Sequence, residues 1–214
     1  MNEQTIDTTR DRLLDQAERL FATKGYGSVS VREITGAARS NLAAVNYHFG
    51  NKHNLYLEVF RERWMERTRR VRKNFEEQIA DRENLAVRDV IEAVARAFLD
   101  GPLTDEELNC HIQLMQRELA HPGEALEMVV EEVMKPYQEL LGKLIRSSLP
   151  FRIEEERLRL SILGILGMTI YFNFARPAVS KVLHRGYDKR FKTELIEHIT
   201  RFAVSGLNDL KREA

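Results

Sequence analysis

Residues 31–52, which read VREITGAARSNLAAVNYHFGNK, describe two short helices joined by a tight polar turn. Ile34, Ala37 and Ala38 give the first helix a small apolar face. Val45 and Phe49, four residues apart, anchor the second helix from the same side. Two short helices that share a small core around a turn are typical of a helix-turn-helix, the motif that places its second helix in the major groove of DNA.

The turn occupies residues 39–41, Arg-Ser-Asn, and Asn41 is placed to cap the second helix through its side-chain oxygen. The apolar anchors leave the small, amide, phenolic and imidazole side chains of this helix facing outward. Such groups suit contacts with base edges and the sugar-phosphate backbone. The outward residues are Leu42, Ala43, Ala44, Asn46, Tyr47 and His48.

The stretch resembles the helix-turn-helix of the TetR family of bacterial transcriptional regulators. The resemblance is strongest over residues 46–52, Asn-Tyr-His-Phe-Gly-Asn-Lys, and beyond the N-terminal part of the chain it rests on length and helical pattern only. The family usually has Gly-Val-Ser where this chain has Arg-Ser-Asn at residues 39–41, so the geometry of the turn is open at this point. In the preceding helix, the resemblance extends through Leu13, Ala17, Leu20, Phe21, Lys24, Gly25 and Tyr26.

The resemblance assigns the DNA contacts to the second helix of the motif. Asn46 offers an amide that can pair with adenine, a contact worth about 1–3 kcal/mol of discrimination. Leu42 and Ala43 can meet thymine methyl groups, and Ala44 allows close approach.

Backbone contacts are expected around the same helix. Tyr47 and His48 resemble the positions that reach sugar and phosphate, and Lys52 resembles the one that neutralises a phosphate. Helix starts and turns also present groups to phosphates. The residues placed there, which complete the expected interface, are Thr9, Ser30, Arg32, Arg39, Ser40 and Asn41.

The charge of the chain permits DNA binding without indicating it. The 33 Lys and Arg and the 33 Asp and Glu residues give a formal net charge of zero. Residues 1–52 carry seven cations and six anions, residues 53–80 carry seven and five, and the rest carry nineteen and twenty-two, which gives +1, +2 and −3. Seven of the cations lie between Arg61 and Lys73, where a solvated helix face and auxiliary phosphate attraction are both possible explanations.

Several classes of protein are excluded. Cys110 is the only cysteine, so an intramolecular disulfide and a cysteine zinc cluster are ruled out. The six histidines lack metal-ligand spacing, and no phosphate-binding glycine loop or nucleophile motif occurs, so we expect no enzyme, no cofactor and no metal. The charged start, Met1 to Arg12, is unlike a secretory signal, and the longest uncharged run, residues 160–175, is too short to span a bilayer. A cytoplasmic protein without a membrane partner is expected.

Helical periodicity without strand alternation predicts an all-α fold. We expect an N-terminal three-helix, helix-turn-helix DNA-binding domain at residues 1–52 and a C-terminal helical domain for effector binding and dimerisation at residues 53–214. Pro136 lies inside an expected helix and should kink or split it. The helices expected after residue 51 span approximately residues 52–79, 87–100, 104–120, 124–148, 153–174, 178–183 and 189–211.

Capping residues mark several helix starts. Thr8 or Thr9 can cap the first helix through its hydroxyl. Ser30 with Glu33, and Thr104 with a glutamate three residues later, have the pattern of a capping box.

Residues 160–174 are apolar on nearly every side, so a helix there has to be buried on nearly every side. One face can pack on the chain itself and the other on a second copy; the alternative is a monomeric core. The family resemblance also implies a homodimer, whose two heads would read a pseudo-palindromic operator with half-sites about one turn (~34 Å) apart. The expected interface residues are Ser161, Gly164, Gly167, Tyr171, Phe174, Leu195, Ile199 and Phe202.

A small-molecule site is expected among the C-terminal helices. The resemblance implies one because TetR-like regulators are released from DNA by small effectors. Mostly apolar walls with a few polar groups suit such a site, although ordinary core packing explains each single residue as well. The candidates are Phe98, Cys110, His111, Leu114, Met115, Met128, Tyr137, Phe172 and Asn173.

These features lead to the hypothesis of a transcriptional repressor that binds double-stranded operator DNA as a homodimer. An unidentified small-molecule effector would release it by favouring a conformer that fits the operator poorly. The alternative is a helical regulator or adaptor without small-molecule control, which acts through DNA or protein contacts only.

Overall fold

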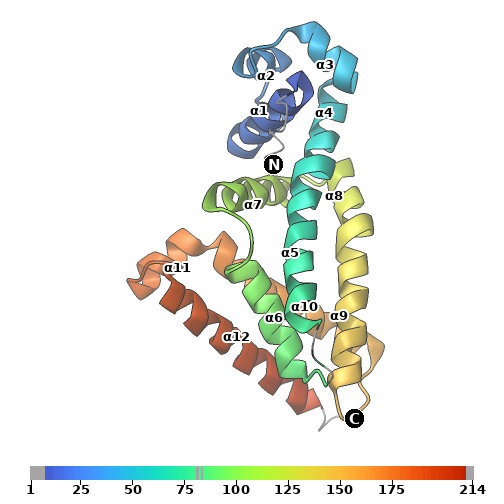
Figure 1. Cartoon of the computed structure of the whole chain (residues 1–214), viewed down its shortest axis with the longest axis vertical. Coiled ribbons are helices and arrows are strands. Elements are labelled where there is room, and N and C mark those ends of the chain that lie inside the picture. The colour runs from blue at the N-terminus through green and yellow to red at the C-terminus, as the bar shows by residue number, and fades with distance from the viewer. Residues whose placement is uncertain (1–7, 81, 83, 211–214) are drawn as a thin grey trace, which may run out of the picture. The chain divides into compact units, whose positions relative to one another are not determined.

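The computed structural model describes residues 8–80, 82 and 84–210, and its helices are shown in Figure 1. Over these residues the chain forms helices and connections without a strand, which confirms the predicted all-α fold. In chain order the helices are α1 (Thr9–Lys24), α2 (Val31–Ala37), α3 (Leu42–Phe49), α4 (Lys52–Val59), η1 (Phe60–Trp64), α5 (Met65–Ile79), α6 (Val87–Leu99), α7 (Asp105–Ala120), α8 (Glu124–Val129), η2 (Val130–Met134), α9 (Lys135–Ser148), α10 (Glu155–Phe174), α11 (Arg176–Leu183) and α12 (Lys189–Asp209). The predicted end of the last helix, Lys211, lies outside the described residues.

Side-chain caps begin several helices, as the sequence predicts. Thr8, rather than Thr9, caps α1 by accepting a hydrogen bond from the amide of Asp11. The hydroxyl of Ser30 caps α2, but the carboxylate of Glu33 pairs with Lys24. At α7 both hydrogen bonds of the predicted capping box are present, because Thr104 and Glu107 each accept from the other's backbone amide.

Two π-helical turns, η1 and η2, interrupt otherwise continuous helices. The second precedes Pro136, which has no amide hydrogen and whose ring would collide with the carbonyl four residues before it in a regular helix. The wider π turn allows the helix from α8 into α9 to continue instead. The expected kink or break at Pro136 is therefore replaced by a local change of helix type.

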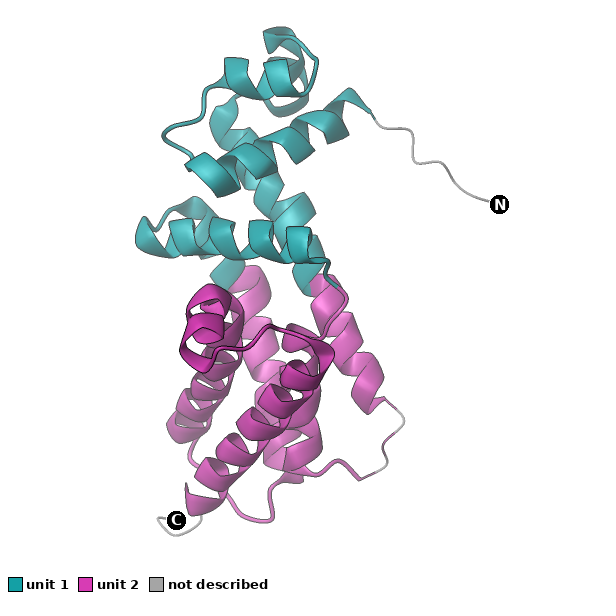
Figure 2. Cartoon of the chain, turned by 90° about the vertical axis from the view of Figure 1, so that its left-hand side faces the viewer, with its two compact units in different colours: residues 1–68, 103–130 teal, residues 69–102, 131–214 magenta. Residues whose placement is uncertain are grey.

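The chain forms two compact units, coloured separately in Figure 2. Unit 1 comprises residues 1–68 and 103–130, and unit 2 comprises residues 69–102 and 131–214. The helix-turn-helix therefore shares a compact unit with α4, α7 and α8, which come from separate parts of the sequence.

The core of unit 1 is built around α1, which packs against α2, α3, α4 and α7. Leu13, Leu14 and Phe21 of α1 are fully buried, together with Ile34 of α2 and Val45 of α3. The apolar faces predicted for the two helices of the motif thus meet a third apolar face, from α1, except at Ala37, which is exposed while Ala38 is buried.

Arg117 of α7 closes the end of α1. Its guanidinium donates to the carbonyl oxygens of Ala22 (2.8 Å) and Thr23 (2.5 Å), which the helix end leaves without helical partners. Gly25 follows with φ +83°, and a Cβ there would lie 2.9 Å from the Arg117 guanidinium. The positive φ favours glycine at this position, whereas a Cβ would only have to displace the end of the Arg117 side chain.

Glu118, the next residue of α7, is a buried carboxylate with three hydrogen-bond donors. It accepts from the hydroxyl of Tyr56 (2.6 Å) and from the amides of Gly123 (2.9 Å) and Leu126 (3.1 Å) at the start of α8. A buried carboxylate needs such donors to offset the loss of its hydration. Glu118 therefore joins α4, α7 and α8 within unit 1.

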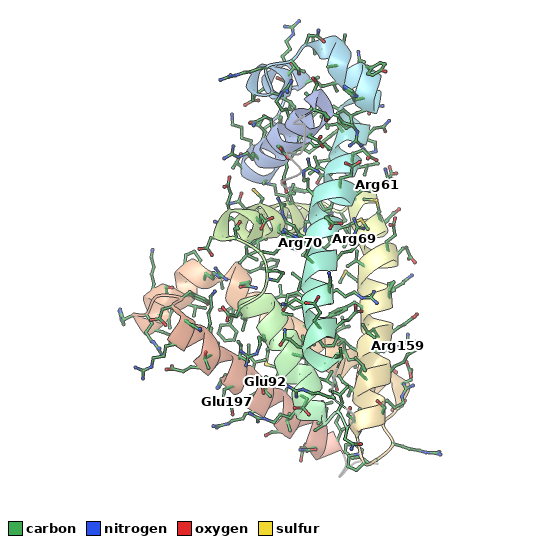
Figure 3. The ribbon with its side chains drawn as sticks, viewed as in Figure 1. Arg61, Arg69, Arg70, Glu92, Arg159 and Glu197 are labelled. Carbon is green, nitrogen blue, oxygen red and sulfur yellow. The ribbon has the colours of Figure 1, made fainter. Side chains whose placement is uncertain are left out.

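Unit 2 is built around the packing of α12 against α6, with α9 and α10 alongside. Ala95, Leu99, Phe191 and Ile196 form part of its buried cluster. Arg88 of α6 forms an ion pair of 2.5 Å with Glu197 of α12. Glu197 is labelled in Figure 3. This exposed pair adds little stability beside the apolar contact.

Among the described residues, no single helix is long and apolar enough to cross a membrane; α10 and α11 together meet that length and composition, but they join at a bend of 78°.

Candidate functional site

The exposed face of α3 is the central feature of unit 1. Val45 and Phe49 are buried, as predicted from their spacing, and they turn the opposite side of the helix to solvent. Tyr47 is 86% exposed, Leu42 is 44% exposed, and Ala43 and Asn46 are also exposed, whereas Ala44 and His48 are half-buried. The helix thus presents an amide, a phenol and small apolar groups, a combination able to meet base edges and backbone in a major groove.

The turn before α3 has a defined geometry. Asn41 caps the helix, because its side-chain oxygen accepts from the amide of Ala44 at 3.0 Å. Arg39 takes up a left-handed conformation with φ +50°, at the position where the resembling family usually has glycine. The difference from the family at residues 39–41 therefore keeps a helix cap, from Asn41. It also places the arginine side chain at a backbone conformation that glycine adopts with the least strain.

Ser40 differs from its predicted role as a phosphate contact. Its hydroxyl oxygen is buried and has no hydrogen-bond partner among the described residues. A buried hydroxyl does not reach a phosphate without rearrangement of the turn, so Ser40 is removed from the candidate interface. The other predicted hydroxyls are engaged locally: that of Ser30 caps α2, and that of Thr9 accepts from Arg12 at 3.1 Å.

Lys52 lies at the start of α4, beside the end of α3. Its ammonium donates to the carbonyl oxygen of Tyr26 (2.5 Å) and lies 4.2 Å from the centre of the Tyr26 ring. Partial burial lowers the pKa of this ammonium. These contacts hold the cation against Tyr26, while the Lys52 backbone follows two residues after Gly50, whose φ of +79° ends α3.

Most cations of unit 1 are committed to partners within it. Arg10 pairs with Glu58 and Glu62, Arg63 with Asp15, and other cations of the unit make similar contacts. Over the described residues of unit 1, Arg32 and Arg39 are the lysine or arginine side chains without a hydrogen bond or ion pair. The unpaired positive charge of the unit therefore lies on α2 and on the turn before α3.

The basic stretch between Arg61 and Lys73 is largely neutralised. Arg61 pairs with Glu58 at 2.8 Å, and Arg72 with Glu76 at 2.8 Å. Arg69 and Arg70, labelled on α5 in Figure 3, also have interaction partners. Of the two explanations offered by the sequence, these pairings favour a solvated helix face over auxiliary phosphate attraction.

Both parts of the sequence match known families. Residues 13–59 match the family described as bacterial regulatory proteins, tetR family. Residues 87–207, more than half of the chain, match the C-terminal domain of the HTH-type transcriptional dual regulator CecR. The chain belongs to the TetR family. Members of this family are DNA-binding regulators of transcription and not enzymes, which confirms both predictions.

Individual relatives agree with this assignment. The chain is similar to the HTH-type transcriptional dual regulator CecR of Shigella flexneri, with 27% identity over 200 residues that cover 89% of this chain and 86% of that protein. Its N-terminal part is similar to the HTH-type transcriptional repressor AcnR of Corynebacterium glutamicum, with 39% identity over 54 residues, or 25% of this chain and 29% of that protein. The fold is that of the fatty acid degradation regulator FadR from Bacillus halodurans, with a TM-score of 0.66 and 21% identity over 93% of this chain and 96% of that one.

The predicted dimer residues of this TetR-family chain divide into two groups. Leu195 and Ile199 are 5% and 0% exposed and pack in the core of unit 2, so they are not available to a partner, which corrects their prediction. In a second group, Gly164, Gly167 and Tyr171 of α10 and Phe202 of α12 are exposed, Phe202 by 64%. Leu160 and Leu163 of α10, which were not among the predicted dimer residues, are exposed as well, Leu160 by 62%. Ser161 and Phe174 are half-buried. We define this α10–α12 apolar surface as Leu160, Leu163, Gly164, Gly167, Tyr171 and Phe202.

The predicted effector residues also divide between the units. Cys110, His111, Leu114, Met115 and Met128 belong to unit 1, and Phe98, Tyr137, Phe172 and Asn173 belong to unit 2. A separate cleft of about 270 Å³ between α9 and α10 contains none of them. Its lining is mostly charged, which differs from the mostly apolar walls expected of an effector site. The charged lining residues are Lys135, Glu139, Lys143, Arg146, Glu155 and Arg159.

In unit 1, His111 is held in a neutral state. Its ring stacks on Trp64 at 4.3 Å with an interplanar angle of 6°, and the indole N–H of Trp64 donates to the His111 carbonyl oxygen at 3.0 Å. Burial, and secondarily the charge of Arg67, lowers the pKa of His111 from 6.5 to about 3. Its Nδ1 is buried without a hydrogen-bond partner among the described residues.

In unit 2, three of the four predicted residues come together. The amide of Asn173 donates to the carbonyl oxygen of Phe98 at 2.7 Å, and the rings of Phe98 and Tyr137 lie 6.4 Å apart. Phe172 packs instead against the buried cluster that contains Ala95, Leu99 and Phe191, and its carbonyl oxygen accepts from the hydroxyl of Tyr187 at 2.7 Å.

Sequence reasoning missed the residues that support these groups from a distance in the chain. Trp64 and Phe75 are not among the predicted site residues, although their rings contact His111 and Tyr137 respectively. Glu18 gave a usable signal, since it falls among the apolar positions of α1 and is buried there. Its partner, Arg67, lies 49 residues away, and no local pattern identifies it.

Proposed function

We propose that this TetR-family chain is a ligand-responsive repressor that binds a pseudo-palindromic operator as a homodimer in the cytoplasm. The observation that carries the proposal is the outward face of α3, where Asn46 and Tyr47 are exposed above the buried Val45 and Phe49. In this proposal Asn46 reads a base through its amide, and Leu42 and Ala43 contact apolar base surface.

The phosphate contacts are assigned to cations that are free or follow α3 closely in sequence. Arg32 and Arg39 keep their charge uncompensated among the described residues, and Lys52, two residues after Gly50, has its ammonium held by the carbonyl oxygen of Tyr26. Three such cations in each of two heads would neutralise about six phosphates and give a slope near −5 in a plot of log affinity against log salt.

The α10–α12 apolar surface supports the homodimer. Leu160, Leu163 and Phe202 are exposed on helices whose other faces are buried in unit 2. Large apolar patches on a soluble protein mark interaction sites, and a second copy brings the same surface to a two-fold contact. Glycines 164 and 167 in α10 let a partner helix approach closely.

The response to a ligand is supported by buried polar groups that lack partners. The Nδ1 of His111 in unit 1 and the hydroxyl of Tyr137 in unit 2 are shut off from solvent and unpaired among the described residues. A small molecule that supplies a partner to such groups in one conformer would shift the population toward that conformer.

The test begins with selection of bound sequences from random DNA by the full-length protein. Fluorescence anisotropy should then show tight, salt-sensitive binding to a two-fold-related sequence. Asn46→Ala should relax preference at one base of each half-site, whereas Lys52→Ala should weaken binding to all sequences alike. Weak binding that is blind to sequence would refute the operator, and identical behaviour of the two variants would refute the division between base and phosphate contacts.

A further inference from the structure

The hydroxyl of Tyr137, in α9, is an unsatisfied polar group inside unit 2. Its oxygen is inaccessible to solvent, and it has no hydrogen-bond partner among the described residues. Other tyrosines contrast with it: the hydroxyl of Tyr187 donates to a carbonyl oxygen at 2.7 Å, and that of Tyr56 to a carboxylate at 2.6 Å. Leaving a buried hydroxyl unpaired costs stability, so its retention indicates a partner that is supplied from outside the chain.

Two aromatic rings pack beside the side chain of Tyr137. Phe75 of α5 meets the Tyr137 ring edge-on, with centroids 5.9 Å apart and an interplanar angle of 82°. Phe98 of α6 lies on another side at 6.4 Å, and Asn173 fixes the Phe98 backbone from α10. Three helices in addition to α9 therefore position the surroundings of one unpaired hydroxyl.

The charge near the hydroxyl is balanced. Arg72 and Glu76 of α5 are the charged groups that act on it, and they form an ion pair of 2.8 Å with each other. Burial raises the pKa of the Tyr137 hydroxyl, while Arg72 lowers it and Glu76 raises it. The phenol stays protonated and can both donate and accept a hydrogen bond. Neither charge is free to pair with a charged ligand.

The local helix geometry is also unusual. The π-helical turn Val130–Met134 lies three residues before Tyr137 along the chain, and Pro136 stands next to it. A π turn inserts an extra residue into a helical turn and is found frequently at functional sites.

We infer that the Tyr137 hydroxyl and the rings of Phe75 and Phe98 form the polar end of a site for an uncharged, largely apolar small molecule that carries a single carbonyl or hydroxyl group. The inference rests on the proposed ligand response and names the chemical class of the effector. The ligand's apolar body would pack on the two phenylalanine rings, and its oxygen would pair with the Tyr137 hydroxyl. Anions and cations would lose their hydration there without gaining an opposite charge.

The experiment compares three probes of similar size with the full-length protein. Acetophenone is uncharged and has a carbonyl, toluene lacks a polar group, and benzoate is an anion. Dissociation constants are measured by calorimetry for the wild type, for Tyr137→Phe and for the matched control Tyr187→Phe, whose hydroxyl already has a partner. Unfolding temperatures of the unliganded proteins are recorded alongside.

We expect acetophenone to bind the wild type, and benzoate not to bind. The ratio of acetophenone affinity to toluene affinity should fall by about three- to tenfold in Tyr137→Phe, the size of one neutral hydrogen bond, and stay unchanged in Tyr187→Phe. Unliganded Tyr137→Phe should unfold at a higher temperature than the wild type, and unliganded Tyr187→Phe at a lower one.

An unchanged affinity ratio in Tyr137→Phe, a lower unfolding temperature of that variant, failure of both uncharged probes to bind, or equal binding of benzoate would each overturn the inference. Because these measurements contain no DNA, they are independent of the operator test. Binding of acetophenone with the expected Tyr137 dependence but without an effect on DNA affinity would support the site and refute its role in repression.

Discussion

Arg67 of α5 and Glu18 of α1 form a two-pronged, buried ion pair. The Nη1 of Arg67 donates to the Oε1 of Glu18, and the Nη2 of Arg67 donates to the Oε2 of Glu18 at 2.9 Å. Glu18 is 4% and Arg67 9% exposed, so both charges are largely removed from water. Burial opposes the charge of Arg67, yet its hydrogen bonds to the Glu18 carboxylate and the charge of nearby carboxylates keep its pKa raised. Such a pair fixes two helices in one relative register within unit 1.

Removal of one partner of this pair should be severely destabilising. Arg67→Ala leaves a buried, uncompensated carboxylate at Glu18 and should lower the free energy of unfolding by about 3–5 kcal/mol in urea denaturation. The control is Arg19→Ala, which breaks the exposed pair with Glu106 and should cost less than about 1 kcal/mol. The double replacement Glu18→Leu with Arg67→Met should recover most of the loss. A single-variant cost near that of Arg19→Ala would show that the pair is not buried in solution.

Replacement of Arg39 by glycine should raise the stability of the protein and weaken the salt dependence of its affinity for DNA. Arg39→Gly relieves a left-handed backbone conformation at φ +50° and should stabilise the protein by about 1 kcal/mol. The same change removes an uncompensated cation from each head, so the slope of log affinity against log salt should become shallower by about two for a dimer. Anisotropy titrations at several salt concentrations measure the slope.

Arg32→Ala is the matched comparison for Arg39→Gly. Arg32 is also unpaired among the described residues, but it lies within the regular helix α2. Arg32→Ala should make the slope of log affinity against log salt shallower by the same amount as Arg39→Gly does. Unlike Arg39→Gly, it should not stabilise the protein. An unchanged slope in both variants would place the phosphate contacts elsewhere.

Acidification should destabilise the protein through His111. Its pKa is about 3 in the folded protein and 6.5 in the unfolded reference, so the unfolded chain binds more protons between these values. Stability therefore falls as the pH drops below 6.5, by about 2 kcal/mol between pH 7.5 and pH 5. His111→Phe, which can keep the stack on Trp64, should flatten this part of the profile.

The exposed His121 gives the control for the pH profile. His121→Gln should leave the dependence between pH 7.5 and pH 5 as in the wild type. A His111→Phe profile parallel to the wild type would mean that this imidazole takes up its proton in the folded protein.

The α10–α12 apolar surface should hold the dimer together. Leu163→Glu places a charge on this surface, where Leu163 is 48% exposed, and should yield a folded monomer in sedimentation at micromolar concentration. Leu119→Glu introduces the same charge at a residue of α7 that is 52% exposed and should leave the dimer intact. A dimeric Leu163→Glu variant would exclude this surface as the interface.

The helix-turn-helix was predictable because its signals are local. The spacing of Val45 and Phe49 sets the buried side of α3, and Asn41 and Ser30 begin their helices as their side chains predict. The left-handed conformation of Arg39 was not predictable from its residue type, since arginine rarely adopts it.

The remaining features depend on contacts that a single sequence does not encode locally. Two apolar stripes on one helix look alike, so the burial of Leu195 and Ile199 within their own unit was not separable from burial against a partner. The unpaired state of the Tyr137 hydroxyl depends on α5 and α6, which lie far away in sequence. Periodicity gives the face of a helix and not the identity of its neighbour.

The hydrogen bonds of Arg117 and Glu118 affect how this regulator can be recombined. Both residues lie in α7, yet they close the end of α1 and bind the hydroxyl of Tyr56 in α4. The DNA-reading part of the molecule is consequently discontinuous in the gene, and no single crossover point exchanges it whole. A chimaera that joins a foreign N-terminal segment to this body inherits α7 from the wrong parent. Grafting the segment around residues 103–130 together with the first 68 residues would keep the donor's own contacts.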